Sequence, residues 1–172
     1  MLKTIKSLSM KRWPWLLLTV CAFLLECFAL YMQHVMHVEP CNECIYIRLG
    51  VVGIALSGLL GAVAPRGMIL RWSALTLWLL ALGWSLYRAN LLLDLEQKVR
   101  EGLDASCGRF KGFPDWMPLE SWLPDVFEPR AMCGAVSWTF MNQSVTFWIW
   151  IALLGMALPA LLALVAQTRS AD

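Results

Sequence analysis

The chain has 172 residues, of which 59% are hydrophobic and only 15% charged. Soluble domains carry charge on about a quarter of their residues, so this composition excludes an ordinary soluble protein and indicates a membrane protein. The net charge of +2 gives no basis for a nucleic-acid partner.

Four apolar stretches are long enough to cross about 30 Å of hydrocarbon as helices. Basic residues before the first stretch are typical of a signal peptide, but the stretch is longer than a signal core and three more follow. We therefore expect it to be retained as an anchor. The sequence predicts one all-α membrane domain over residues 1–172, a bundle of four transmembrane helices. The predicted spans are about 13–31, 45–64, 69–87 and 146–166.

The first predicted span contains three residues that are not simple hydrophobes. Cys21 and Cys27 lie in apolar surroundings and are interpreted as buried, inert thiols. Placing a carboxylate in hydrocarbon costs free energy, so we expect Glu26 to have a polar partner. We interpret Glu26 as an interhelical contact, and a role as a proton relay is the alternative.

Short basic segments predict the orientation. They precede the first span, connect the second and third, and follow the fourth, so four spans place all of them on one side. The positive-inside rule makes that side cytoplasmic, together with both termini. The loops at about 32–44 and 88–145 then face the periplasm of a bacterial inner membrane. The basic residues are Lys3, Lys6, Lys11, Arg12, Arg66, Arg71 and Arg169.

The first outward loop ends in Cys41-Asn42-Glu43-Cys44. A bridge across so short a loop removes little chain entropy and makes a poor structural staple. The periplasm is an oxidising compartment, where thiols form and exchange disulfides. The motif is therefore interpreted as an exposed redox dithiol.

Arg48 follows Cys44 by one helical turn and lies on the same face. Because Cys44 stands at the start of the second span, backbone N–H groups there favour a thiolate. A guanidinium just inside the membrane needs an anionic or polar partner. A Cys44 thiolate or a quinone carbonyl would supply one, whereas the alternative is an arginine that reaches the lipid headgroups.

A metal site is a further alternative for this loop. His34, His37, Cys41 and Cys44 are residue types that zinc or copper accepts. A c-type haem is not expected, because Ile45 and not histidine follows the second cysteine. We expect neither a metal nor a haem, since both histidines continue the last turn of the first helix.

The second outward loop carries the other pair of cysteines, Cys107 and Cys133. A bridge between them closes a long loop and would stabilise the fold by about 3 kcal/mol, so a structural disulfide is a credible alternative to a redox one. Between them, apolar residues at helical spacing predict a short amphipathic segment that Pro124 interrupts. The apolar residues are Leu119, Trp122, Leu123, Val126 and Phe127.

These features together resemble the DsbB family, the bacterial quinone-dependent thiol oxidoreductases of disulfide bond formation. The resemblance covers most of the chain, and its combination of a proline, a CxxC motif, an arginine and a second cysteine pair is specific. The residues that carry it are Leu25-Glu26, Gln33-His34-Val35-Met36, Pro40-Cys41, Cys44-Ile45-Tyr46, Arg48, Ala64-Pro65, Phe113-Pro114, Trp116, Pro118-Leu119, Cys133, Trp138 and Phe140.

The resemblance implies an activity, a partner and a cofactor. It implies that a Cys107–Cys133 disulfide receives electrons from DsbA, a soluble periplasmic dithiol oxidase, with Cys107 joining DsbA in a mixed disulfide. It further implies that Cys41 and Cys44 reoxidise that pair, with Cys44 against a quinone ring that Arg48 polarises. Ubiquinone is the expected acceptor, and menaquinone is an alternative.

Two departures from the family pattern and two rival functions remain. Glu43 introduces an acid into the CxxC motif, where it could disfavour a neighbouring thiolate. The outer end of the third span reads Gly83-Trp84-Ser85-Leu86-Tyr87-Arg88, which differs from the family, so no quinone contact is assigned there. The rival functions are a vitamin-K-epoxide-reductase-like enzyme and a membrane metal-binding protein.

Overall fold

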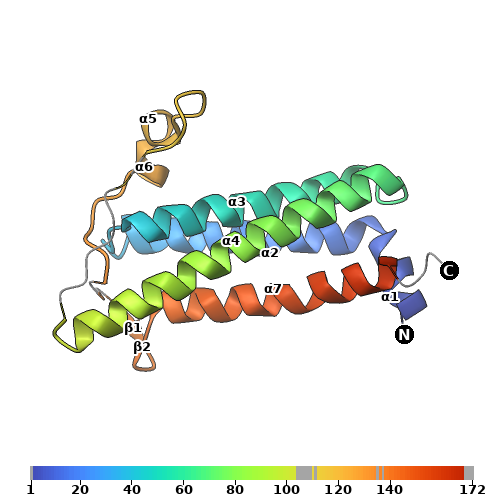
Figure 1. The fold of residues 1–172 in the computed structure, drawn as a ribbon. Coiled ribbons are helices and arrows are strands. Elements are labelled where there is room, and N and C mark those ends of the chain that lie inside the picture. The colour runs from blue at the N-terminus through green and yellow to red at the C-terminus, as the bar shows by residue number, and fades with distance from the viewer. Residues whose placement is uncertain (1, 104–109, 111, 135, 137, 169–172) are drawn as a thin grey trace.

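A computed structural model describes residues 2–103, 110, 112–134, 136 and 138–168. Its elements are four long helices, three short helices and one small hairpin (Figure 1). In chain order they are α1 (Leu2–Ser9), α2 (Arg12–His34), α3 (Asn42–Val63), α4 (Met68–Arg100), α5 (Leu119–Trp122), α6 (Pro124–Phe127), β1 (Thr139–Phe140), β2 (Gln143–Ser144) and α7 (Val145–Thr168).

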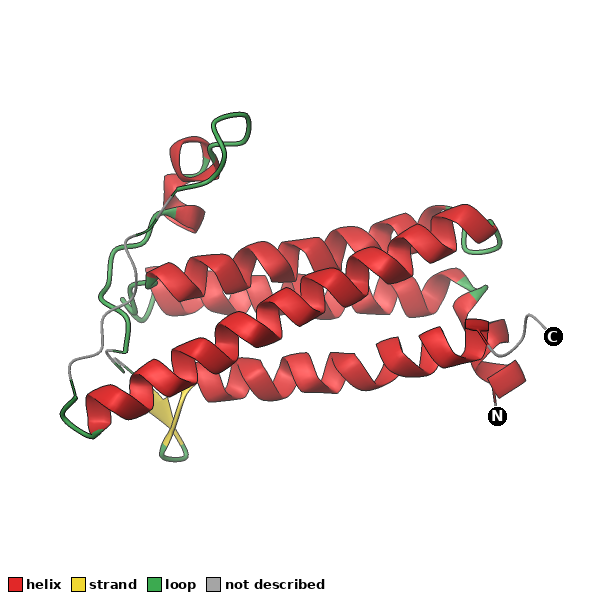
Figure 2. Ribbon diagram, in the orientation of Figure 1, coloured by secondary structure: helices red, strands yellow, loops and turns green. Residues whose placement is uncertain are grey.

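The predicted all-α membrane class is confirmed. The helices α2, α3, α4 and α7 are each long and apolar enough to cross a membrane, and Figure 2 shows that most of the described chain is helical. Within the part of the chain that the structure describes, the only strands are the antiparallel pair β1–β2, which leads directly into α7. Figure 1 places both termini at the same end of the bundle, as four crossings require.

The third long helix continues past its predicted span. The loop predicted to begin at residue 88 is helical as far as Arg100, because apolar residues such as Leu92 and Leu95 remain buried against the bundle. At 1.5 Å per residue, α4 is about 50 Å long and exceeds the hydrocarbon core by several turns. Its C-terminal end therefore lies beside the two loops that the sequence predicts to face the periplasm.

Small residues allow α2 and α3 to approach closely. A Cβ on Gly58 would lie 2.8 Å from the backbone oxygen of Trp15, and one on Gly61 would overlap the indole of Trp15. On its other side α3 packs against α4, where Gly53 meets Ala81. The glycines of α3 therefore serve two neighbours, which places α3 at the centre of the bundle.

The outward loop carries the predicted amphipathic segment as two short helices. The helical structure is interrupted at Leu123, and Pro124 begins α6, as the position of the proline predicts. Phe127 is buried against Ile45 of α3 and Phe113, whereas Trp122 stays 61% exposed. The segment therefore packs its last turn on the outer end of α3.

Candidate redox site

The two cysteines of the CxxC motif form the start of α3. Cys41 is the N-cap residue, and its sulfur accepts a hydrogen bond from the backbone N–H of Cys44 at 3.4 Å. The two sulfur atoms lie 2.7 Å apart, and both cysteines are free thiols. The helix start thus holds the pair at a separation suited to forming and breaking a mutual disulfide.

Contrary to expectation, the motif is not exposed. Cys41 is only 5% exposed, because residues after α6 lie across it. The backbone N–H groups of Arg130 and Ala131 donate to the carbonyl oxygen of Pro40 at 2.9 and 3.1 Å, and Ala131 forms a parallel bridge with Cys41. An incoming protein thiol would therefore have to displace the long loop to reach Cys41.

The same segment brings a second cysteine to the site. Cys133 follows Ala131 by two residues, is disulfide-bonded, and belongs to the same cluster of buried residues as Cys41. Cys107 lies outside the described residues, so its predicted pairing with Cys133 stays a prediction. What the structure establishes is that the two outward loops meet at their cysteines.

The pair is electrically asymmetric. The hydrogen bond to Cys44 raises the pKa of the Cys41 thiol above its ordinary value, and burial raises this pKa further. The raised pKa favours the protonated form of Cys41, and either sulfur can be the donor in the contact between them. The predicted role of Cys44 as the cysteine that faces a quinone stays a prediction.

Arg48 lies one turn into α3 and is buried, which rules out the alternative that it reaches the lipid headgroups. Its guanidinium donates to Gln33 Oε1 at 2.7 Å and to the backbone oxygens of Val126 at 2.8 Å and Ala29 at 3.2 Å. Glu26 lies 4.0 Å from it as the counter-charge. Arg48 therefore joins α2, α3 and α6 at one point.

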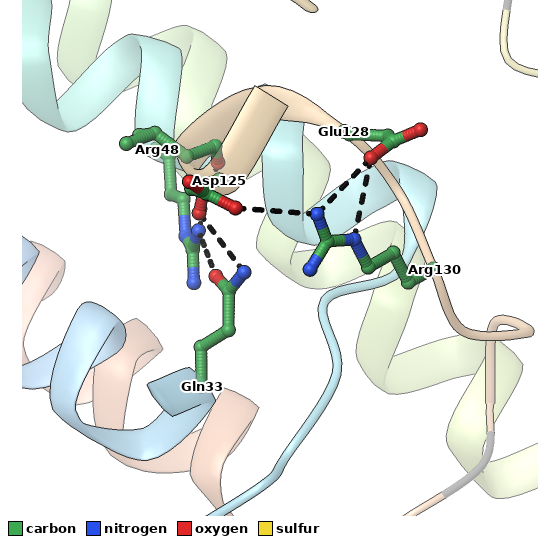
Figure 3. A network of polar contacts seen from close by, with 6 residues as sticks. Gln33, Arg48, Asp125, Glu128 and Arg130 are labelled. Atoms are coloured by element: carbon green, nitrogen blue, oxygen red, sulfur yellow. Dashed lines mark hydrogen bonds and ion pairs between the residues drawn. The ribbon is translucent and has the colours of Figure 1, made fainter. Parts of the chain in front are cut away.

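The loop contacts around Arg48 extend to the surface (Figure 3). Gln33 lies between Arg48 and Asp125, and its amide nitrogen donates to the backbone oxygen of Asp125 at 2.9 Å. Farther out, Arg130 forms ion pairs with Asp125 at 3.3 Å and Glu128 at 3.2 Å. Arg130 is part of the segment that covers Cys41, so one network fixes both α6 and that cover.

A cavity opens beside the dithiol. The polar residues on its wall include Glu26, Cys41, Cys44, Arg48 and Glu96. The remaining wall is mainly apolar, which suits a hydrophobic ring that carries a few polar substituents. Its apolar residues include Leu25, Met32, Ile47, Val51, Leu92 and Ile149.

Two acids of the cavity wall, Glu26 and Glu96, lie on helices of the bundle. The sequence singled out Glu26, which contacts Arg48 as an interhelical partner. It missed Glu96, which is 5% exposed and accepts a 2.6 Å hydrogen bond from Thr146 of α7. The acid was missed because it lies in the part of α4 that the sequence assigned to a loop. A helical periodicity that continues beyond residue 88 was the available signal.

The structure does not bring His34, His37, Cys41 and Cys44 together as one group. Within residues 2–103, 110, 112–134, 136 and 138–168, no three His, Cys, Asp or Glu side chains gather as a metal site. His34 and His37 are exposed at the end of α2 and beyond it. The two cysteines of the first span are also exposed on the bundle, contrary to expectation, and both are free thiols.

Comparisons with known proteins identify the family. Residues 11–163 match the family described as disulfide bond formation protein DsbB. The chain is 40% identical over 157 residues to disulfide bond formation protein B of Shewanella denitrificans, covering 91% of this chain and 88% of the relative. It is 39% identical over 166 residues to the protein of that name from Photobacterium profundum, covering 95% and 92%. This chain belongs to the DsbB family.

Proposed function

We propose that this chain is a thiol:quinone oxidoreductase of the bacterial inner membrane. It takes electrons from the reduced dithiol of DsbA in the periplasm and delivers them to a membrane quinone, which sustains disulfide formation in other proteins. The observation that carries this proposal is the position of Cys41 and Cys44. The pair lines an apolar cavity with Arg48 and lies under the segment that leads to Cys133.

The electrons pass through two disulfides. A DsbA thiolate attacks the Cys107–Cys133 disulfide, and the dithiol formed there reduces the Cys41–Cys44 disulfide by exchange. Oxidation of the Cys41–Cys44 dithiol to its disulfide then releases two electrons and two protons. The quinone takes up all four and becomes quinol. The quinone supplies oxidising power that thiol exchange alone lacks.

The residues around the cavity have separate tasks in this scheme. Arg48 supplies positive charge beside Cys44, and the apolar wall excludes water from the reacting sulfur. Cys41 would keep its proton until the two sulfurs bond to each other, when that proton and the electron pair would leave for the quinone. Ubiquinone is the proposed acceptor, and menaquinone is the alternative that would contact the same cavity residues. The outward loops are proposed to face the periplasm, with both termini in the cytoplasm.

The activity is tested with purified protein, excess reduced DsbA and ubiquinone, followed by the loss of quinone absorbance. The native chain is expected to reduce quinone over many turnovers, and Cys44→Ser is expected to abolish reduction. Cys27→Ser is the matched control, because this exposed thiol lies away from the cavity. Absence of quinone reduction by the native chain with either ubiquinone or menaquinone would refute the proposal.

The order of the two disulfides is tested separately. Cys107→Ser is expected to stop oxidation of DsbA while quinone still converts a chemically reduced Cys41–Cys44 pair to its disulfide. The state of that pair is measured by mass after alkylation. If this variant oxidises DsbA at the native rate, electrons enter at another cysteine and the assigned order is wrong.

A further inference from the structure

The acid within the CxxC motif has a partner on another helix. Glu43 is 6% exposed, and its carboxylate accepts from Nη1 of Arg88 on α4, at 3.1 Å to Oε2 and 3.4 Å to Oε1. The two residues are separated by most of α3 and α4 in sequence. Glu43 and the stretch Gly83–Arg88 are the two places where the sequence differs from the family pattern. The ion pair between Glu43 and Arg88 therefore connects these two differences.

Aromatic rings hold Arg88 in place. Its guanidinium carbon lies 4.4 Å from the ring centroids of both Tyr46 on α3 and Trp84 on α4. The Trp84 indole N–H also donates to the backbone oxygen of Tyr46 at 3.2 Å. The rings attract the cation and restrict its motion. Arg88 is thus fixed against the first turn of α3, and Glu43 has a permanent counter-charge.

The charge of Glu43 matters because the dithiol is its immediate neighbour. Cys44 is the next residue, and side-chain charges act strongly where water is excluded. Among the described residues, the other charged groups on the cavity wall beside the cysteines are Glu26 on α2, Arg48 on α3 and Glu96 on α4, with Glu39 before the motif. From α7, Thr146 lines the cavity without a charge. An unpaired Glu43 would add a further negative charge to this set.

We propose that Arg88 is a positioning residue that sets the redox potential of the Cys41–Cys44 pair by neutralising Glu43. The inference rests on the proposed function, in which this pair is redox-active. Without Arg88, the Glu43 carboxylate disfavours negative charge on the sulfurs, which destabilises the reduced pair and favours the disulfide. Without Glu43, the unpaired Arg88 cation has the opposite effect.

The two single substitutions are therefore expected to shift the potential in opposite directions. Arg88→Gln should favour the disulfide by about tenfold, which is about 30 mV more negative for a two-electron couple. Glu43→Gln should shift the potential to a more positive value by a similar factor. The double substitution should return the equilibrium to within about twofold of native, because both charges are then absent. Arg88→Lys should stay near native, because the charge is retained.

The measurement equilibrates purified, quinone-free protein with thiol redox buffers and counts free Cys41 and Cys44 by mass after alkylation. Asp94→Asn is the control, since it removes an exposed acid of α4 that pairs only with Lys98 among its described ion-pair contacts. Shifts in the same direction for both single variants, or no shift in either, would overturn the proposal. Thermal unfolding of each variant identifies loss of fold, and Arg88→Lys then tests the charge alone.

This experiment contains neither DsbA nor quinone, so its failure is distinguishable from failure of the proposed function. If the protein reduces no quinone but the two variants shift the potential in opposite directions, the proposed role of Arg88 stands and the proposed function fails. If the protein reduces quinone but the variants show no such shifts, the proposed role of Arg88 is wrong.

Discussion

Arg48 and Glu96, two charged side chains of the cavity, each have a hydrogen-bond partner on another element. Arg48 of α3 reaches Gln33 of α2 and a carbonyl of α6, and Glu96 of α4 reaches Thr146 of α7. In a low-dielectric interior such bonds are strong, and an unpaired member is costly. The hydrogen bonds that shape the site are therefore also those that hold the outer ends of the helices together.

Arg48→Lys tests the contacts of the guanidinium. An ammonium retains the charge, but it cannot donate in the forked geometry that serves Gln33 and Val126 together. Leaving a buried acceptor without its donor costs about 1–3 kcal/mol, so the free energy of unfolding in detergent should fall by that amount. Arg130→Lys is the control, because that ion pair is exposed and screened by water, so the variant should unfold much as the native chain does. Equal losses in both variants would contradict the buried network.

Thr146→Val tests the partner of Glu96. The substitution preserves shape and removes the hydroxyl that donates to Glu96 Oε1 at 2.6 Å. The other carboxylate oxygen is buried without a hydrogen bond among the described residues, so the variant leaves both oxygens unpaired. We expect a loss of about 1–3 kcal/mol in unfolding free energy. Thr168→Val, at an exposed hydroxyl of the same helix, should unfold as the native chain does.

At the scale of elements, the close contacts of α3 with its neighbouring helices depend on glycines, which have no side chain. The sequence shows Gly53, Ser57 and Gly61 at intervals of four, which favours close packing by another helix. In the structure Gly53 meets α4 and Gly61 meets α2, while Gly58, outside that series, makes the closest approach to backbone. Spacing indicated a packing face on α3, but it did not reveal that two helices share it.

Gly58→Ala tests this approach. The added Cβ would lie 2.8 Å from the backbone oxygen of Trp15 and 2.9 Å from the backbone nitrogen of Thr19, so α2 must move. Overpacking of this kind costs about 1–3 kcal/mol, which thermal unfolding in detergent will measure. Gly155→Ala of α7 is the matched control, since nothing lies within 4 Å of its added Cβ. That variant should be neutral or more stable by up to about 1 kcal/mol. A destabilised Gly155→Ala with an unaffected Gly58→Ala would contradict this packing.

At the scale of the whole molecule, the sequence predicts features that depend on one segment at a time. Apolar runs gave the spans, and Pro124 gave the break between α5 and α6. The position of Cys44 at a helix start and of Arg48 one turn later also follows from local spacing. Each of these features is encoded within a few residues, so no knowledge of the packing was needed.

The features that the sequence did not predict are contacts between distant segments. Gln33 and Val126 meet at Arg48, and Glu43 meets Arg88, only because the helices pack side by side. The cover over Cys41 is likewise a pairing of the long loop with Pro40, and no local pattern predicts it. The burial of the dithiol, which the sequence reading had as exposed, is therefore a property of the assembled bundle.

The orientation of the whole chain in the membrane is a further prediction, and thiol labelling of intact cells can test it. In a background where the six native cysteines are replaced by serine, Met132→Cys and Ser7→Cys each provide one exposed thiol, since both positions are exposed. Met132 lies in the outward loop and Ser7 in α1 at the opposite end of the bundle. A membrane-impermeant maleimide should label Met132→Cys in intact cells whose outer membrane admits it. It should label Ser7→Cys only after the inner membrane is opened, because the basic N-terminal segment favours the cytoplasm. The reverse labelling pattern would place the dithiol in the reducing compartment and remove the basis for the proposed periplasmic partner.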